Sequence, residues 1–260
     1  MMRTVTLIPL LLLTLISVIA GAWADTPLPT LYIIGDSTVK NHTAGLEGWG
    51  DPIAAYFDPA KIHVENNALG GRSSRTFLTE GLWQKVLDKI KPGDFVLMQF
   101  GHNDGGGVTH GYRASLKGTG DETQDVTNEK TGKQETVHTY GWYMRKYVTD
   151  AKDKGAQPIV ISPIPRNIWS ADNKVGRNIH DYGLWAAQVA ESEHVPFLDL
   201  NKIVADRYDA LGPDKVKAEY FPGDHTHTSP AGAELNAESV VEGIKALDGC
   251  PLAQYLAKHE

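Results

Sequence analysis

Five short apolar runs, each bounded by turn-forming residues, are the feature of the sequence that most constrains its fold. They lie at residues 31–34, 62–64, 95–100, 159–161 and 197–200, and several contain no alternation of polar and apolar side chains. Strands that are buried on both faces have this pattern, and they belong to parallel sheets covered by helices. The runs therefore predict the five strands of one parallel sheet.

Segments with helical periodicity lie between these runs. IAAYF follows Asp51-Pro52, and LWQKVLDKI, WYMRKYVTDAKDK and YGLWAAQVAESE follow later in the chain. The last segment, SPAGAELNAESVVEGIKAL, begins with Ser229 as the expected N-cap and Pro230 at the first helical position. Because strand and helix alternate, we predict an α/β fold, a three-layer α/β/α sandwich with right-handed crossovers around a doubly wound sheet.

The first 24 residues have the composition of a secretory signal peptide. A basic start, MMR, precedes an apolar core from about Val5 to Ala20, and AWA forms a small-residue cleavage site at Ala24. The core is shorter than the roughly 18 to 20 residues of a membrane span. We therefore expect a signal peptide over residues 1–24, one mature domain over residues 25–260, and a secreted or periplasmic protein with no membrane anchor.

The composition excludes some partners and one source of stability. Loss of Arg3 with the signal peptide leaves 24 of the 25 basic residues against 32 acidic ones, a formal charge of −8. This charge argues against nucleic acid as a partner. Cys250 is the only cysteine, so no internal disulfide can form and the core must supply the stability. We expect the protein to be a monomer.

The interval from Gly105 to Thr139 breaks the alternation of strand and helix. It is rich in Gly, Thr and charged residues, and QDVTNEKTGKQETVH predicts a hairpin around residues 128–132. An insertion of this length in a compact domain is usually a functional loop or disordered. Because it follows the third predicted strand, we expect it to lie on the rim where ligands bind and to shape a substrate groove.

Polar and small residues follow the predicted strands at their carboxyl ends, where open parallel sheets bind ligands. GDST starts at Gly35 after the first strand, NNALGGRSSR starts at Asn66 after the second, and GHND starts at Gly101 after the third. FPGDHTHTSP, residues 221–230, precedes the last predicted helix. We expect all four clusters to share one rim.

These clusters contain the groups that acyl transfer requires. A serine hydroxyl is a weak nucleophile until a histidine removes its proton, and the histidine needs a carboxylate to fix its tautomer. Glycine N–H groups and an asparagine amide can stabilise the oxyanion that forms.

Two other interpretations of the same residues stay open at this point. Ser37 could be a helix N-cap, with FPGDHTHTSP a polar helix entry that has no chemistry. Alternatively, a zinc ion could be held by residues of suitable type, namely His102, Asp104, Asp224, His225 and His227. No HExxH or Cys/His spacing supports the zinc site, and such a site would leave the serine after the first strand without a role.

Four motifs of the chain resemble those of a known superfamily. IIGDSTVK, LGGRSSRTF, QFGHNDGG and DHTHTSPAG are similar, in this order, to the four blocks of the SGNH or GDSL-type hydrolases, and most similar to their rhamnogalacturonan acetylesterase branch, carbohydrate esterase family 12. The resemblance runs from about Leu31 to Leu247 and implies a flavodoxin-like fold. The GxSxG elbow of the standard α/β-hydrolases is absent.

The resemblance also implies roles for individual residues. By position it makes Ser37 the nucleophile, and its Asp-x-x-His pattern makes Asp224 the orienting carboxylate and His227 the general base. The Ser37 backbone N–H, Gly71 and Asn103 would form the oxyanion hole. It implies a reaction that needs neither a metal nor another cofactor.

Candidate substrate contacts are less specific than these motifs. Arginine binds carboxylates bidentately, so Arg72, Arg75 and Arg166 could meet an acidic sugar, although each suits a structural ion pair equally well. His102 lies beside the site and is a further candidate. Trp49, Trp142 and Trp169 could stack on sugar rings, but we expect them in the core.

Together these features predict an exported serine esterase that removes O-acetyl groups from a plant cell-wall polysaccharide, with the rhamnogalacturonan of pectin as the first choice. Its expected partner is the acetylated polysaccharide or oligosaccharide. One alternative is an esterase of the same fold that acts on acetyl-xylan or on simple short-chain or lipid esters. A second is a secreted carbohydrate-binding protein without catalytic activity.

Overall fold

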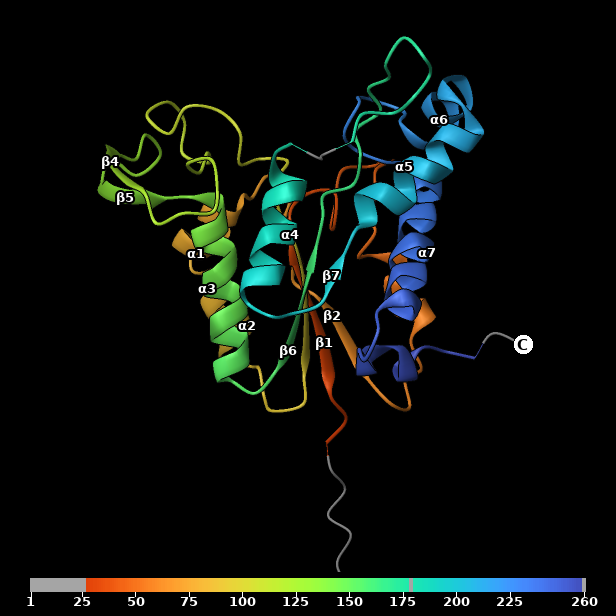
Figure 1. The fold of residues 1–260 in the computed structure, drawn as a ribbon, viewed down its shortest axis with the longest axis horizontal. Coiled ribbons are helices and arrows are strands. Elements are labelled where there is room, and N and C mark those ends of the chain that lie inside the picture. The colour runs from red at the N-terminus through yellow and green to blue at the C-terminus, as the bar shows by residue number, and fades with distance from the viewer. Residues whose placement is uncertain (1–26, 178–179, 259–260) are drawn as a thin grey trace, which may run out of the picture.

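A central sheet of five parallel strands organises the chain (Figure 1). The structure is a computed structural model that describes residues 27–177 and 180–258. The predicted signal peptide, residues 1–24, lies outside the described residues. The strands are β1 Thr30–Gly35, β2 His63–Asn66, β3 Phe95–Gln99, β6 Gln157–Ile161 and β7 Phe197–Leu198. They confirm the predicted five-stranded parallel sheet.

Helices cover both faces of this sheet and give the predicted three layers (Figure 1). One face is covered by α1 Ser74–Thr79, α2 Leu82–Leu87, α3 Tyr140–Asp153 and α4 Tyr182–Ser192. The other is covered by α5 Leu200–Leu211, α6 Pro213–Tyr220, α7 Pro230–Ala246 and two 3₁₀ helices, η1 Pro52–Tyr56 and η2 Pro251–Tyr255. The sequence did not predict α1, α5 or α6. Within the described ranges, no helix has both the length and the apolar character needed to cross a bilayer.

The strands are buried on both faces, as their sequences predict. In β1, Leu31 and Ile33 pack into the core on the α7 side, whereas Tyr32 and Ile34 pack into the core on the α3 side. Successive side chains of a strand point to opposite faces, so a strand between two helical layers needs apolar residues at every position. The same requirement accounts for β3, in which all five residues are buried.

The order of the strands, β2-β1-β3-β6-β7, determines where a ligand can bind. The chain moves from β1 to β2 on one side and then returns to place β3 on the other side of β1. The loops after β1 and β3 therefore diverge at the carboxyl ends of the strands and leave a crevice between them. The carboxyl ends of the strands point to the upper edge of the sheet in Figure 1.

The predicted hairpin in the insertion is confirmed. β4 Thr123–Thr127 and β5 Gln134–His138 pair antiparallel as a separate two-stranded sheet, and the backbone N–H groups of Thr131 and Gly132 donate to Asn128 O in the turn. Val108, Ala114, Val126 and Val137 form a small apolar cluster beneath it. The insertion therefore has a core of its own.

We expect Gly35→Ala to lower the free energy of unfolding by about 1–3 kcal/mol, because the end of β1 has no room for a side chain. A Cβ at Gly35 would lie 2.5 Å from Val39 Cγ2 and 2.8 Å from the carbonyl oxygen of Gln99 on the paired strand β3. Urea unfolding measures the change. Gly107→Ala is the control, because a Cβ there would meet nothing within 4 Å. Equal stability of the two variants would contradict this account.

Candidate active site

Loops at the carboxyl edge of the sheet surround an open cleft of about 560 Å³. Each of the four motif clusters contributes to it, and the insertion contributes one charged side chain. Its lining includes Ser37 after β1, Gly70 and Gly71 after β2, Asn103 after β3, Arg113 in the insertion and His227 ahead of α7. The structure thus brings the four clusters to one rim, as the strand order requires.

A chain of buried hydrogen bonds fixes the turn that carries Ser37. Trp49 Nε1 donates to Gln99 Oε1 at 2.9 Å, and Gln99 Nε2 donates to Thr38 Oγ1 at 2.6 Å. Thr38 in turn donates from both its backbone N–H and its hydroxyl to Asp36 Oδ1, each at 2.8 Å. Asp36 therefore supports the turn, and Trp49, fully buried, lies in the core as expected.

Ser37, His227 and Asp224 form a continuous line of hydrogen bonds. Ser37 Oγ lies 2.8 Å from His227 Nε2, and His227 Nδ1 lies 2.7 Å from Asp224 Oδ2. A carboxylate only accepts hydrogen bonds, so Nδ1 carries the proton and Nε2 is left to accept from the serine hydroxyl. This arrangement lets the imidazole take the serine proton while the carboxylate stabilises the resulting cation.

Asp224 is held as a carboxylate by its hydrogen bonds. Partial burial alone would raise its pKa, but hydrogen bonds from the His227 ring and from the backbone N–H groups of His227 and Thr226 lower the pKa to about 2. Those N–H groups donate to Asp224 Oδ1 at 2.8 and 2.6 Å. Asp224 is therefore ionised at neutral pH, which is the state that His227 requires.

The loop that carries Asp224 and His227 is anchored on both sides. Ser229 Oγ accepts from Gly232 N and donates to Glu219 O, so it caps α7, as predicted, and ties α7 to α6. Thr228 makes two hydrogen bonds with Glu47, at 2.9 Å each, through its hydroxyl and its carbonyl. His225 lines a separate cavity that shares no residue with the cleft, so the structure places only His227 of the two histidines beside Ser37.

Two backbone donors and one amide face the cleft near Ser37. In the described ranges, the backbone N–H groups of Ser37 and Gly71 donate to no other protein group. Gly71 has φ +76°, a left-handed conformation that glycine adopts without strain. A Cβ on the preceding Gly70 would lie 3.6 Å from Ser37 Cβ, so this turn runs directly beside the serine. Donors in this position can stabilise an oxyanion.

Arg113 also lines this site, although it was not among the residues predicted from the sequence. Its Nη1 donates to Asn103 Oδ1 at 2.9 Å, and Asn103 Nδ2 donates to Arg72 O at 3.0 Å. These two hydrogen bonds fix which end of the Asn103 amide is oxygen and which is nitrogen, and Asn103 lines the same cleft as Ser37. Arg113 comes from the insertion, which has no motif or periodicity that could have marked it.

Two of the three candidate arginines form structural ion pairs, which were the other possibility predicted from the sequence. Arg75 is fully buried and forms a bidentate ion pair with Glu135, at 2.7 and 2.9 Å, so the structure does not support the expected substrate contact for it. Arg72 pairs with Glu80 at 3.0 Å and donates to Gly70 O at 2.9 Å. Arg72 therefore holds the Gly70-Gly71 turn in place.

The remaining two candidate substrate contacts, Arg166 and His102, line a small cavity of about 160 Å³. Arg166 Nη2 donates to His102 O at 3.1 Å, while Arg166 Nε and His102 Nε2 are buried without a hydrogen-bond partner in the described part of the chain. Burial lowers the pKa of His102, and the charge of Asp36 opposes this shift. The structure does not assign either residue to substrate.

The residues considered for a zinc site are not arranged around a common point. Among residues 27–177 and 180–258, no group of three or more His, Cys, Asp or Glu side chains could hold a metal ion. Asp104 is buried and accepts hydrogen bonds from Ser74 and Ser115. His227, in contrast, is hydrogen-bonded to Asp224 and to Ser37.

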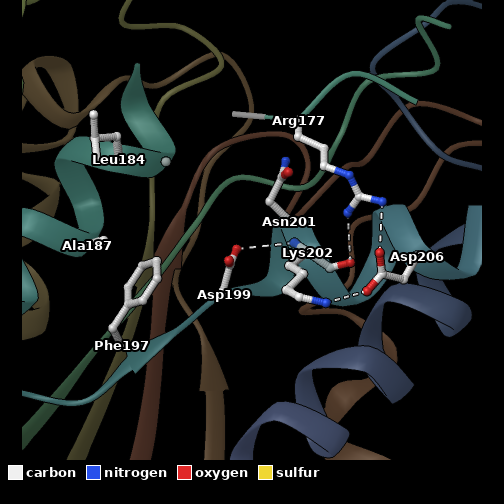
Figure 2. A pocket seen from close by; sticks show the side chains of 9 residues that line it. Arg177, Leu184, Ala187, Phe197, Asp199, Asn201, Lys202 and Asp206 are labelled. Carbon is white, nitrogen blue, oxygen red and sulfur yellow. Dashed lines mark hydrogen bonds and ion pairs between the residues drawn. The ribbon is translucent and has the colours of Figure 1, made fainter. Parts of the chain in front are cut away.

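Another cavity, of about 430 Å³, lies beside β7 between α4 and α5 (Figure 2). Its charged side chains neutralise one another, since Asp206 accepts from Arg177 at 2.8 Å and from Lys202 at 2.6 Å. Leu184 and Phe197 form its apolar wall. It shares no residue with the cleft at Ser37, so we place the candidate active site at the cleft.

Asp104, which follows Asn103, is a buried carboxyl group with an unusual titration. Burial raises its pKa to about 7, although hydrogen bonds from Ser74 and Ser115 oppose the shift. Ser74 N donates to Asp104 Oδ1 at 3.1 Å, its hydroxyl makes a second bond to the same oxygen, and Ser115 Oγ donates at 3.2 Å. Asp104 thus joins the end of β3 to α1 and to the insertion.

This titration predicts a pH dependence of stability. The folded state binds a proton on Asp104 more tightly than the unfolded chain does, so ionisation between pH 4 and pH 7 costs stability as the pH rises. Asp104→Asn cannot ionise. We therefore expect the Tm of the wild type, measured relative to that of Asp104→Asn, to fall by on the order of 5 °C from pH 4 to pH 7. A constant difference would contradict the raised pKa.

The chain is similar in sequence to one family of ester hydrolases and to individual acetylesterases. Residues 33–235 match the GDSL-like Lipase/Acylhydrolase family. The chain is 33% identical over 233 residues to a rhamnogalacturonan acetylesterase of Emericella nidulans, covering 89% of each chain. It is also 33% identical over 235 residues to a probable rhamnogalacturonan acetylesterase, YesY, of Bacillus subtilis, covering 88% of this chain and 97% of that one.

Among solved structures, the crystal structure of Bacillus subtilis protein YxiM matches with a TM-score of 0.69 at 26% identity. The match covers 85% of this chain and 57% of YxiM, which is the longer protein. The family match extends over most of the chain and contains Ser37, Gly71, Asn103, Asp224 and His227. The chain therefore belongs to the GDSL-like lipase/acylhydrolase family of ester hydrolases.

Proposed function

We propose that this protein is a carbohydrate acetylesterase that removes O-acetyl groups from plant cell-wall polysaccharide, with rhamnogalacturonan as its substrate. The observation that carries the proposal is the hydrogen-bonded line from Ser37 through His227 to Asp224 at the edge of an open cleft. The similarity to the rhamnogalacturonan acetylesterase of Emericella nidulans and to YesY supports the choice of substrate.

In the first half of the proposed reaction, Ser37 Oγ attacks the carbonyl carbon of the acetyl group. His227 Nε2, 2.8 Å away, takes the serine proton as the new bond forms. Asp224, ionised because its pKa is about 2, stabilises the imidazolium. His227 then gives the proton to the departing sugar hydroxyl, and an acetyl group remains on Ser37.

The negative charge on the carbonyl oxygen is stabilised by groups that are in place before the reaction. The backbone N–H groups of Ser37 and Gly71 and the amide of Asn103 are the proposed donors. Arg113 keeps the Asn103 amide in one orientation, so no reorganisation is needed when the charge develops. Water then attacks the acetyl-enzyme with His227 again as the base, which releases acetate and restores Ser37.

We also propose that the protein is exported. Residues 1–24 support this proposal through their basic start, apolar core and small-residue cleavage site. A polysaccharide substrate outside the cell would agree with it.

Ser37→Ala should reduce acetate release below detection, because no other group can form the acetyl-enzyme. The measurement is acetate released from acetylated rhamnogalacturonan, acetylated xylan and p-nitrophenyl acetate, with and without a chelator. We expect the wild type to act fastest on rhamnogalacturonan, and the chelator to have no effect. Faster acetate release from xylan would contradict rhamnogalacturonan as the substrate. A Ser37→Ala protein that stays active and is inhibited by the chelator would contradict the serine mechanism and favour a metal site.

His225 supplies the matched control for the histidine of this mechanism. His227→Ala should lower kcat by at least about 10³-fold, since the general base is lost. His225→Ala removes a histidine from the same loop that lines the neighbouring cavity and not the cleft. Both variants are measured on p-nitrophenyl acetate, which is too small to reach that cavity from Ser37. A larger loss in His225→Ala than in His227→Ala would overturn the assignment.

Arg113→Ala should lower kcat for p-nitrophenyl acetate about tenfold with little change in KM, because the Asn103 amide acts on the transition state more than on the bound ester. Added guanidinium ion should restore part of the lost rate. Lys117→Ala, which removes an exposed cation from the same insertion, is the control. A rise in KM without a fall in kcat would show that Arg113 binds the ester instead.

A further inference from the structure

A cavity of about 350 Å³ lies next to the proposed catalytic loop and shares no lining residue with the cleft at Ser37. Asp224 and His225 form one wall of this cavity, which we call the Trp169 cavity. Trp169 and Asn167 come from the loop between β6 and α4, Asp214 comes from the first turn of α6, and Lys217 comes from its last turn. Its volume lies within the range of small-molecule sites, roughly 300–1,000 Å³.

The indole ring of Trp169 is held in place at this cavity. Trp169 Nε1 donates to Asn167 Oδ1 at 2.6 Å, so its polar atom is already satisfied. The backbone of Trp169 pairs with Val175, whose N–H donates to Asp209 Oδ1 at 2.9 Å. The ring packs partly against the core and is partly exposed. Trp169 therefore differs from Trp49, which is fully enclosed.

Two side chains of the cavity, Asp214 and Lys217, are without a protein partner in the described part of the chain. Asp214 and Lys217 are exposed, and within the described residues neither forms an ion pair or a side-chain hydrogen bond. A sugar ring has an apolar C–H face and an edge of hydroxyl groups. A fixed aromatic ring flanked by a free acceptor and a free donor matches both parts.

We propose that the Trp169 cavity is a subsite for a sugar ring of the polysaccharide that neighbours the acetylated ring. This inference rests on the proposed function, because it needs a carbohydrate chain at Ser37. The cavity and the cleft are separated by the Asp224–His227 pair, whose two side chains form parts of their respective walls. A chain that occupies both would lie across the catalytic loop.

Occupation of this subsite would also act on the reaction. The Asp224 side chain is 45% exposed and that of His227 is 30% exposed, so water screens the attraction between them. A sugar ring over Asp224 displaces this water, and the attraction of the carboxylate for the imidazolium becomes stronger at lower local dielectric. Binding at the Trp169 cavity should therefore raise kcat as well as lower KM.

The test compares Trp169→Ala and Trp169→Phe with the wild type on acetylated rhamnogalacturonan and on p-nitrophenyl acetate, which is too small to span both sites. We expect Trp169→Ala to lower kcat/KM for the polysaccharide at least about tenfold more than for the small ester, with changes in both kcat and KM. Trp169→Phe should recover much of the loss because it keeps an aromatic ring. Trp142→Ala is the control, since Trp142 is also partly exposed but stacks on His138 with ring centroids 3.7 Å apart.

A binding measurement separates the failure of this inference from the failure of the proposed function. Ser37→Ala protein titrated with acetylated rhamnogalacturonan should show a change in tryptophan emission that is lost in Ser37→Ala/Trp169→Phe. If the wild type releases acetate from the polysaccharide and Trp169→Ala does so with unchanged constants, the subsite is overturned and the function stands. If the wild type cleaves only p-nitrophenyl acetate and the titration shows no binding, both are overturned.

Discussion

A hydrogen bond of 2.8 Å between Ser37 and His227 joins two residues that are 190 positions apart, and much of the fold serves to bring them together. Ser37 follows a strand at the centre of the sheet, with β2 on one side and β3 on the other. His227 precedes α7, which packs on the sheet beside η1. The Thr228–Glu47 hydrogen bonds then connect the α7 loop to the segment that follows Ser37. The site depends on this long-range closure, because neither loop contains a complete set of reactive groups.

The pKa values of two carboxyl groups near the cleft, Asp224 and Asp104, are shifted in opposite directions for different physical reasons. Asp224 is partly exposed and receives two backbone N–H bonds and the His227 proton, which together lower its pKa to about 2. Asp104 is fully buried, and the hydrogen bonds it receives do not offset the cost of burying a charge, so its pKa rises to about 7. The first environment suits a group that must carry charge during a reaction. The second suits a group that joins three segments of structure.

The fold could be predicted from the sequence as far as burial left a local pattern. β1 and β3 are apolar at consecutive positions because helices cover both faces, and Ser229-Pro230 marks the start of α7. The predicted strand at 197–200 is present as β7, but its early end at Leu198 could not be predicted in this way. Asp199 accepts from Lys202 N at 3.1 Å and starts α5 at Leu200, so a run that looked like strand continues as helix.

Part of the candidate site could also be predicted from the sequence. The motifs identified Ser37, Asp224 and His227, and the structure places these three residues in hydrogen-bond contact. The partners of the arginines could not be predicted. Arg75 and Glu135 are 60 residues apart, and nothing in the local sequence of either one indicates the other. Likewise, no motif indicates that Trp169 is partly exposed at a cavity that it shares with Asp214 and Lys217 of α6.

The insertion shows how such distant contacts can determine the geometry of a site. Three consecutive residues of it are fixed by the main fold: Arg113 by Asn103, Ala114 by Arg75, and Ser115 by Asp104. Arg75 donates to Ala114 O at 2.9 Å while its other nitrogens bind Glu135, so one buried side chain holds both the strand β5 and the segment next to Arg113. A guanidinium on a free loop would spend much of its time away from the Asn103 amide. Because its neighbours are pinned, Arg113 loses little further entropy on meeting Asn103, and the insertion becomes part of the wall of the cleft.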